Sequence, residues 1–388
     1  MQDRARRIVA DMLAPQSLDD FFARHFERSA LFVPAGQRTG SARTGAEDPE
    51  MALLAAYKTD AHNLTSHAAD PAGPPPGPRR AVSRADYRSL VGDYHAQGHT
   101  VRIPACGGHF PHIARFARAL TELMSVPVET AAFWSAEGAK APVHYDDEDL
   151  FAIQMHGRKR WFVSTAPPRL PNPWRQIGER PPELGSHSVI DMAPGDLLYV
   201  PRGTPHYVIS TTDSIHLSVG FSPLTVRDAI VAMIDQLADL HRPLRETFAS
   251  GADGSRIAEG LSLLTQQARN PRFLQAALAS RTSRMIGKLP KLEQSTAKPD
   301  APPSRVRQAD LAIASVLKTA DIIDFSQPGT HILIHPGAEE AVRFIAETDE
   351  FWVDELPGGL APDVRNALVA QFIGSGFLVP ADGPAAGR

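Results

Sequence analysis

The chain has 388 residues, enough for two or three domains. Apolar residues make up 43%, charged residues make up 22% and the net charge is −4, which excludes a wholly disordered chain and an overall basic surface for nucleic acid. The single cysteine excludes an intrachain disulfide and a cysteine-rich zinc site. We expect a cytoplasmic protein, because the first residues lack a secretory signal pattern and no apolar run reaches the roughly 18 residues of a membrane span.

Residues 1–125 are predicted to form helices joined by loops. Ser17 and Asp20 have the spacing of a capping box at the start of an apolar-faced segment. The run Pro74–Pro78 excludes helix and central strand. In chain order we expect a helix over 17–26, a strand over 31–33, loops over 36–49 and 70–80, and a helix over 112–124.

Residues 126–224 change to short β-rich runs separated by Gly and Pro. Many short strands with turn residues between them are typical of a sandwich or barrel. The predicted strands are 131–135, 150–155, 160–163, 196–200 and 215–219.

The remaining chain is predicted to hold a helical region, a linker and a small α/β unit. Residues 225–290 show helical periodicity, with Ile230, Met233, Ile234 and Leu237 on one face, and the polar, proline-containing segment 291–308 is predicted to be a linker. In the last unit, residues 309–388, we expect strands over 331–334 and 377–379 and helices over 339–347 and 362–373.

The most informative residues are His144 and Asp146. On a strand, residues i and i+2 point to the same face, so this pair aims an imidazole and a carboxylate at one point. Sixty residues later, a Gly195 turn, an apolar run and a Pro201–Gly203 turn lead to His206. Two histidines and one carboxylate are the facial triad of non-haem Fe(II) oxygenases. The alternatives are that HxD is a solvated surface pair, or that His156 or His187 is the third ligand; neither of these has the turn context of His206.

These residues carry a family resemblance. Gly138-x5-His144-x-Asp146 with Gly157, followed by Gly195-x5-Pro201-x-Gly203-x2-His206, resembles the two cupin motifs. The run from His144 to Trp161 resembles more narrowly the JmjC ribosomal oxygenases. The resemblance implies a mainly β double-stranded β-helix core with helical additions. It also implies a helical dimerisation region over 225–290, hence a homodimer, and a C-terminal winged-helix-like domain.

The same resemblance implies Fe(II) as the metal, with 2-oxoglutarate and O2 as cosubstrates of a protein hydroxylase. The cation for the distal carboxylate of 2-oxoglutarate is expected fifteen residues after the first ligand, which is Lys159, and its hydroxyl partner at Ser135. The neighbouring arginines at 158 and 160 should point to the opposite face of the strand. Ser218 and His216 share a face of the last strand; Ser218 is a candidate pocket residue, while His216 fits a satisfied core histidine better.

The charges favour a basic substrate. From residue 309 to the end, twelve acidic residues stand against four basic ones, a net charge of −8 that disfavours phosphate binding. Asp147, Glu148 and Asp149 are expected directly after the strand of the triad. We therefore expect a basic protein or peptide, ribosomal proteins included, as substrate, without direct nucleic-acid or membrane binding. The alternatives are a tailoring hydroxylase of a natural-product peptide or small molecule, and a non-catalytic cupin-like binding module.

Overall fold

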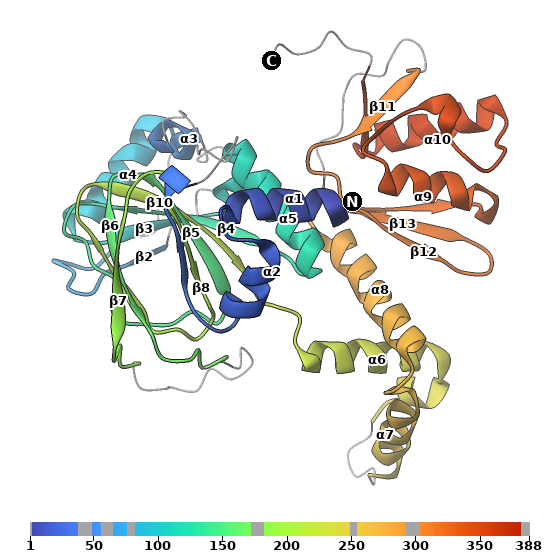
Figure 1. Ribbon diagram of the computed structural model, residues 1–388, viewed down its shortest axis with the longest axis horizontal. Helices are drawn as coiled ribbons and strands as arrows, with labels where there is room; N and C mark the ends of the chain where they lie inside the picture. Colours follow the sequence, from blue (N-terminus) through green and yellow to red (C-terminus); the bar gives the residue numbers. More distant parts are fainter. Residues whose placement is uncertain are drawn as a thin grey trace. The chain divides into compact units, whose positions relative to one another are not determined.

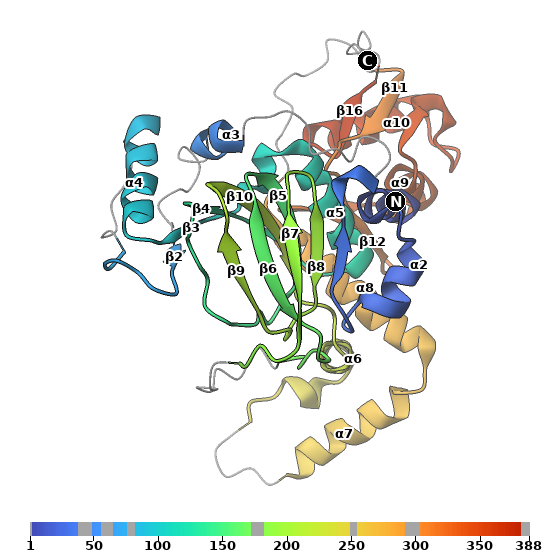
Figure 2. The same ribbon diagram turned by 60° about the vertical axis from the view of Figure 1, so that its left-hand side comes forward.

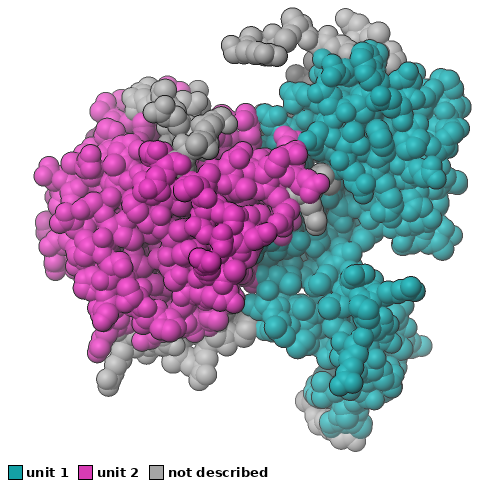
Figure 3. Space-filling view, in the orientation of Figure 1, with its two compact units in different colours: residues 1, 124–126, 224–388 teal, residues 2–123, 127–223 magenta. Residues whose placement is uncertain are grey.

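The computed structural model describes residues 2–37, 49–55, 65–75, 82–171, 182–248, 254–291 and 303–381. The chain divides into two compact units (Figure 3). Unit 2 comprises residues 2–123 and 127–223, and unit 1 comprises residues 1, 124–126 and 224–388.

Unit 2 is built around two antiparallel sheets. The larger has seven strands in the order β1-β8-β5-β10-β4-β3-β2, and the smaller has three in the order β7-β6-β9. Figure 2 shows the smaller sheet in front of the larger one. The strands are β1 (Leu31–Val33), β2 (Thr65–His67), β3 (Thr100–Pro104), β4 (Glu129–Ser135), β5 (Asp149–His156), β6 (Lys159–Ser164), β7 (His187–Met192), β8 (Leu197–Val200), β9 (His206–Ser210) and β10 (Ser214–Phe221).

Helices cover one face of the larger sheet (Figure 1). Phe116 packs edge-on against Phe151 of β5 at a centroid distance of 5.3 Å, and Phe21 packs against Tyr199 of β8 at 4.9 Å. The predicted cap is present, since the Ser17 side chain accepts a hydrogen bond from the Asp20 backbone. The helices of this part are α1 (Gln2–Leu13), α2 (Leu18–Asp20) with the π turn η1 (Phe21–His25), α3 (Pro49–Ala55), α4 (Arg84–Ala96) and α5 (Pro111–Met124).

The other face of the larger sheet is turned toward the smaller sheet. Along β10, Leu217 and Val219 are fully buried, while His216 and Ser218 line a cavity between the two sheets. Successive side chains of a strand point to opposite faces, so one strand serves both a helix-covered core and a polar cavity.

The helical part of unit 1 contains α6 (Val226–Leu240), η6 (Arg242–Arg245), α7 (Ser255–Gln267) and α8 (Pro271–Lys288). The predicted helix is present, but its apolar face is only partly covered. Met233 and Leu237 are buried, whereas Ile230 and Ile234 are each 41% exposed.

The C-terminal part of unit 1 has two three-stranded antiparallel sheets, in the orders β15-β11-β16 and β12-β13-β14. Phe325, Phe372 and Phe377 meet in its core. Its elements are β11 (Arg305–Gln308), β12 (Ser315–Lys318), β13 (Ile323–Gln327), β14 (Thr330–Ile334), η7 (Pro336–Ala338), α9 (Glu339–Glu347), β15 (Glu350–Trp352), η8 (Val353–Glu355), α10 (Pro362–Gly374) and β16 (Leu378–Pro380).

All the predicted strands and helices are confirmed to within a few residues. In unit 2 the sequence did not predict strands β2, β3, β7 and β9 or helices α1, α3 and α4. Strand β11 begins inside the predicted linker, whose residues 292–302 lie outside the described residues, as do 38–48 and 76–80 of the two predicted loops. In the part of the chain that the structure describes, no helix is both long enough and apolar enough to cross a membrane.

Candidate metal centre

The structure brings His144, Asp146 and His206 together. One ligand atom of each lies within 4.8 Å of the others, and Nε2 of His206 is 3.7 Å from Oδ2 of Asp146. The two imidazole rings have centroids 4.3 Å apart. His206 is buried and Asp146 is partly exposed, so the group opens to one side.

The reason for this convergence differs from the expected strand alternation. His144 and Asp146 precede β5 in an irregular segment, not on a regular strand. His144 forms a single antiparallel bridge with His206, through backbone N–H···O bonds of 3.0 and 2.8 Å. Pairing of the two segments therefore places the first and third residues side by side.

The turn glycines behave as the motif predicts. Gly195 and Gly203 have φ values of 92° and 76°, which side chains rarely adopt. A Cβ on Gly203 would lie 2.8 Å from the backbone nitrogen of Leu170. The Gly203 N–H also donates to the carbonyl oxygen of Asp146 at 2.7 Å, joining the turn before His206 to the segment of the carboxylate.

Backbone carbonyls orient both imidazoles. Nδ1 of His144 lies 2.8 Å from the Pro142 oxygen, and Nδ1 of His206 lies 3.0 Å from the Thr204 oxygen. A carbonyl only accepts, so each Nδ1 carries the proton and each Nε2 keeps its lone pair, as in metal-ligating histidines. Burial lowers the pKa of His206, which favours the neutral ring. The donor set therefore fits a divalent iron-type metal.

The two rival histidines lie elsewhere. His156 and His187 are exposed at strand ends, and His187 contacts the ring of Phe162 at 5.8 Å. Neither lines the cavity that holds the triad.

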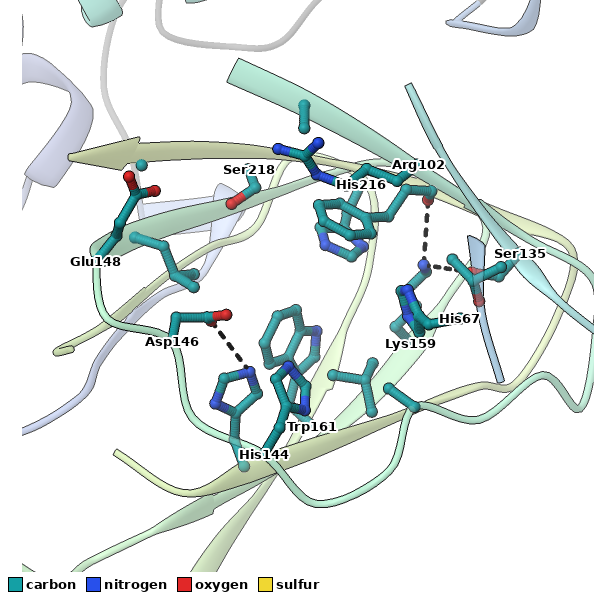
Figure 4. A pocket seen from close by; sticks show the side chains of 18 of the residues that line it. His67, Arg102, Ser135, His144, Asp146, Glu148, Lys159, Trp161, His216 and Ser218 are labelled. Atoms are coloured by element: carbon teal, nitrogen blue, oxygen red, sulfur yellow. Dashed lines mark hydrogen bonds and ion pairs between the residues drawn. The ribbon is translucent and has the colours of Figure 1, made fainter. Parts of the chain in front are cut away.

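The triad opens into a cavity of about 390 Å³ between the two sheets (Figure 4). Lys159 enters the same cavity from β6 and is 2% exposed. Its Nζ donates to Oγ of Ser135 at 2.8 Å and to the Phe133 carbonyl at 3.2 Å. Burial lowers the pKa of Lys159 to about 7. One ammonium donor therefore remains for a ligand.

The neighbours of Lys159 have the predicted orientation. Arg158 and Arg160 are exposed, and Arg160 forms a two-bond ion pair with Asp191 on β7. Because successive side chains point to opposite faces, Lys159 enters the cavity and its two neighbouring arginines do not.

The prediction that His216 is a satisfied core histidine is wrong. It lines the cavity with Ser218, and its Nδ1 atom is buried without a hydrogen-bond partner. Its ring stacks on Phe133 at 4.9 Å and meets Trp161 edge-on at 5.4 Å. Burial, and then the nearby Lys159, lower the pKa of His216 well below its usual value.

Several cavity residues were not predicted from the sequence, among them His67, Arg102, Glu129 and Trp161. Trp161 stacks on His206 at 5.6 Å. Arg102 had a readable signal, since Thr100 and Arg102 alternate with apolar residues in a run that proved to be β3. His67 had no such signal in the sequence, because its strand is only three residues long and shows no alternation.

Acidic side chains line the cavity around the carboxylate of the triad. They are Glu129, Asp147 and Glu148, and burial, reinforced by its acidic neighbours, raises the pKa of Glu148. The expected position of this acidic run is wrong, since residues 147 and 148 precede β5. Asp149 is fully buried and does not line the cavity.

Comparison with known proteins adds a family match. The JmjC domain family matches residues 109–229. The chain is 26% identical over 229 residues to the bifunctional lysine-specific demethylase and histidyl-hydroxylase NO66 of Drosophila persimilis, covering 56% of this chain and 31% of that protein. It is 39% identical over 83 residues to ribosomal oxygenase 2 of Rattus norvegicus, covering 20% of this chain and 17% of that protein. The chain thus spans a third or less of the length of these relatives.

Solved structures extend the likeness to nearly the whole chain. The X-ray structure of Escherichia coli ycfD has a TM-score of 0.57 at 18% identity and covers 94% of this chain and 98% of that one. The structure of YcfD in complex with cobalt and 2-oxoglutarate has a TM-score of 0.55 with the same coverage and identity. At this identity the likeness concerns the fold, and it confirms the predicted cupin-type core with helical additions.

Proposed function

We propose that this protein is an Fe(II)- and 2-oxoglutarate-dependent hydroxylase, because residues 109–229 match the JmjC domain family and the chain is similar to ribosomal oxygenases. The observation that carries the proposal is the convergence of His144, Asp146 and His206 in one cavity with the buried Lys159. A metal site and a carboxylate site in the same cavity are what this chemistry requires.

Each residue has a definite part. His144, Asp146 and His206 would hold the metal, and a three-residue donor set leaves further metal positions for cosubstrates. Lys159 pairs with the distal carboxylate of 2-oxoglutarate, and Ser135 holds the ammonium group in place. Ser218 lines the same cavity and offers a hydroxyl to the bound molecules. When bound, the metal supplies the redox chemistry by which O2 converts 2-oxoglutarate to succinate and CO2 and oxidises a substrate C–H bond to an alcohol.

Aromatic side chains form part of the cavity walls. Trp161 lies against His206, and Phe133 lies against His216, so aromatic surface flanks both the metal side and the carboxylate side. Because Lys159 is buried beside these rings, its pairing with a bound carboxylate would be little weakened by water.

We propose further that the substrate is a basic protein or peptide and that the hydroxylated carbon belongs to an Arg or His side chain. Glu129, Asp147 and Glu148 around the triad, and the acidic C-terminal residues, support this choice because they attract cationic partners. The names of the relatives, a histidyl-hydroxylase and a ribosomal oxygenase, make ribosomal proteins the first substrates to test.

A homodimer is also proposed. Among the described residues, α6 exposes apolar side chains along its length, including Val226, Ile230, Val231 and Ile234. Exposed apolar patches of this kind mark association surfaces.

The deciding experiment is mass spectrometry of ribosomal proteins and peptides incubated with the enzyme, Fe(II), 2-oxoglutarate and O2. We expect a gain of one oxygen atom on a basic residue, matched by succinate release, and no gain with the His206→Ala variant. Oxidation of a small molecule alone would favour the tailoring hydroxylase. Absence of 2-oxoglutarate turnover with every substrate would favour a non-catalytic binding module.

A further inference from the structure

A buried polar cluster lies beside the metal centre but outside its cavity. It consists of Glu27, Asp149, Tyr199 and Arg202, and none of the four lines the cavity. Asp149 and Tyr199 are fully buried, and Arg202 is 8% exposed. Charged groups are rarely buried to this extent unless they are paired.

The hydrogen bonds make the cluster one connected unit. The Tyr199 hydroxyl donates a short hydrogen bond to Oδ1 of Asp149 and accepts one of 3.1 Å from the Glu27 backbone N–H. Arg202 binds Oε1 of Glu27 through Nε at 3.0 Å, and the same Nε lies 3.8 Å from Oδ2 of Asp149. Burial raises the pKa of Asp149 to about 7, although Tyr199 and Arg202 favour its charged form.

The cluster touches both segments that carry the triad. Asp149 follows Asp146 by three residues and begins β5, whereas Arg202 precedes His206 by four residues in the turn after β8. The two segments also meet at the Gly203–Asp146 backbone hydrogen bond. Glu27, which has a φ of 53°, joins them from the N-terminal segment and holds both Tyr199 and Arg202.

We propose that this cluster is the positioning device of the metal centre: it fixes the segment of His144 and Asp146 against the turn of His206, so its loss weakens metal binding although every ligand remains. The inference rests on the proposed function. Tyr199 and Asp149 are positioning residues, because they act on the metal only through the backbone of the ligand segments. Groups hydrogen-bonded to the ligand side chains change metal affinity by about 10- to 100-fold, so the lower end of that range is expected for residues that act through the backbone.

The test compares Mn(II) affinity, by calorimetry on the full chain, among matched variants. Tyr199→Phe removes the hydroxyl and keeps the ring packing against Phe21, and we expect its Mn(II) dissociation constant to rise about tenfold. Asp149→Ala should do the same. Asp149→Asn keeps an oxygen that can accept from Tyr199 but loses the attraction between the carboxylate and Arg202, so its Mn(II) affinity should lie between those of the wild type and Asp149→Ala.

A destabilised control separates positioning from general loss of stability. Leu90 of α4 is buried in the same unit and is not part of the cluster or the cavity, so Leu90→Ala should lower the melting temperature and leave Mn(II) affinity unchanged. Unchanged affinity in Tyr199→Phe, equal losses in Tyr199→Phe and Leu90→Ala, or an Asp149→Asn variant as weak as Asp149→Ala would each overturn the inference. Wild-type protein that binds no Mn(II) would overturn the proposed function as well.

Discussion

The ammonium group of Lys159 lies 2.8 Å from the hydroxyl oxygen of Ser135, on a strand of the opposite sheet. Together with the Phe133 carbonyl, Ser135 uses two of the three ammonium donors and points the group across the cavity. A buried lysine held in this way offers a fixed positive charge to one carboxylate.

Replacing Lys159 with Ala should weaken 2-oxoglutarate binding by about ten- to a hundredfold, because a charge-assisted hydrogen bond contributes roughly 1.5–3 kcal/mol. Isothermal titration of the Mn(II)-loaded protein measures this change. Arg160→Ala is the matched control, since Arg160 is exposed and pairs with Asp191 outside the cavity. Equal losses in both variants would contradict the assigned role of Lys159.

The pH dependence of 2-oxoglutarate binding should follow the same lysine. Burial lowers the pKa of Lys159 to about 7, so the ligand-free protein loses this proton as the pH rises above that value. The carboxylate needs the charged ammonium group, so affinity should be constant below pH 7 for as long as the metal stays bound, and fall by up to about tenfold per pH unit above pH 7. Titrations across this range test it. Lys159→Arg should flatten the profile, because arginine stays protonated.

The triad makes a direct prediction about metal. His144→Ala, Asp146→Ala and His206→Ala should each abolish turnover and reduce Mn(II) binding severely, with circular dichroism unchanged. Each variant removes one of the three proposed ligands, which form the candidate metal group found among the described residues. His187→Ala is the matched control, since that histidine is exposed and outside the cavity. Full activity in His206→Ala would disprove the third ligand and make His216 the next residue to test.

Turnover of a basic peptide should fall as ionic strength rises, because salt screens attraction to exposed charges over about 8–10 Å. The double variant Glu129→Gln with Glu148→Gln should lower the apparent affinity for the peptide and reduce its salt dependence. A neutral peptide of the same length is the control. Salt-independent turnover of the basic peptide would favour a neutral substrate.

Assembly gives a further test. Light scattering at micromolar concentration should show a dimer, and Ile234→Asp should shift it toward monomer, because Ile234 is apolar and 41% exposed on α6. Leu333→Asp is the control, as Leu333 is exposed on β14 at 62%. A wild-type monomer would disprove the proposed dimer.

The sequence predicts that His144, Asp146 and His206 converge, because turn residues at fixed offsets leave few conformations around His206. It also predicts Lys159 over its neighbours, since strand alternation is a strict geometric rule. The conformation around His144 could not be predicted in this way: the HxD spacing suggested a strand, and the actual placement depends on a bridge to residue 206.

The rest of the site depends on pairings between distant segments. His67, Arg102 and Phe133 meet because β2, β3 and β4 are neighbours in one sheet, and that strand order is not encoded in local periodicity. The cluster of Glu27, Tyr199 and Arg202 is likewise assembled over more than 170 residues of sequence separation. Strands such as β2, with three residues, are too short to show a period of two.

The three consecutive basic residues 158–160 have a consequence for the tolerance of this fold to insertions. A shift of β6 by one residue in either direction would turn Lys159 toward solvent and an arginine toward the cavity. The cavity would then still contain a cation, longer and permanently charged. The run Arg-Lys-Arg therefore keeps a positive charge in the cavity even if β6 shifts by one residue. Only the present register places Lys159, whose pKa is lowered to about 7, in the cavity.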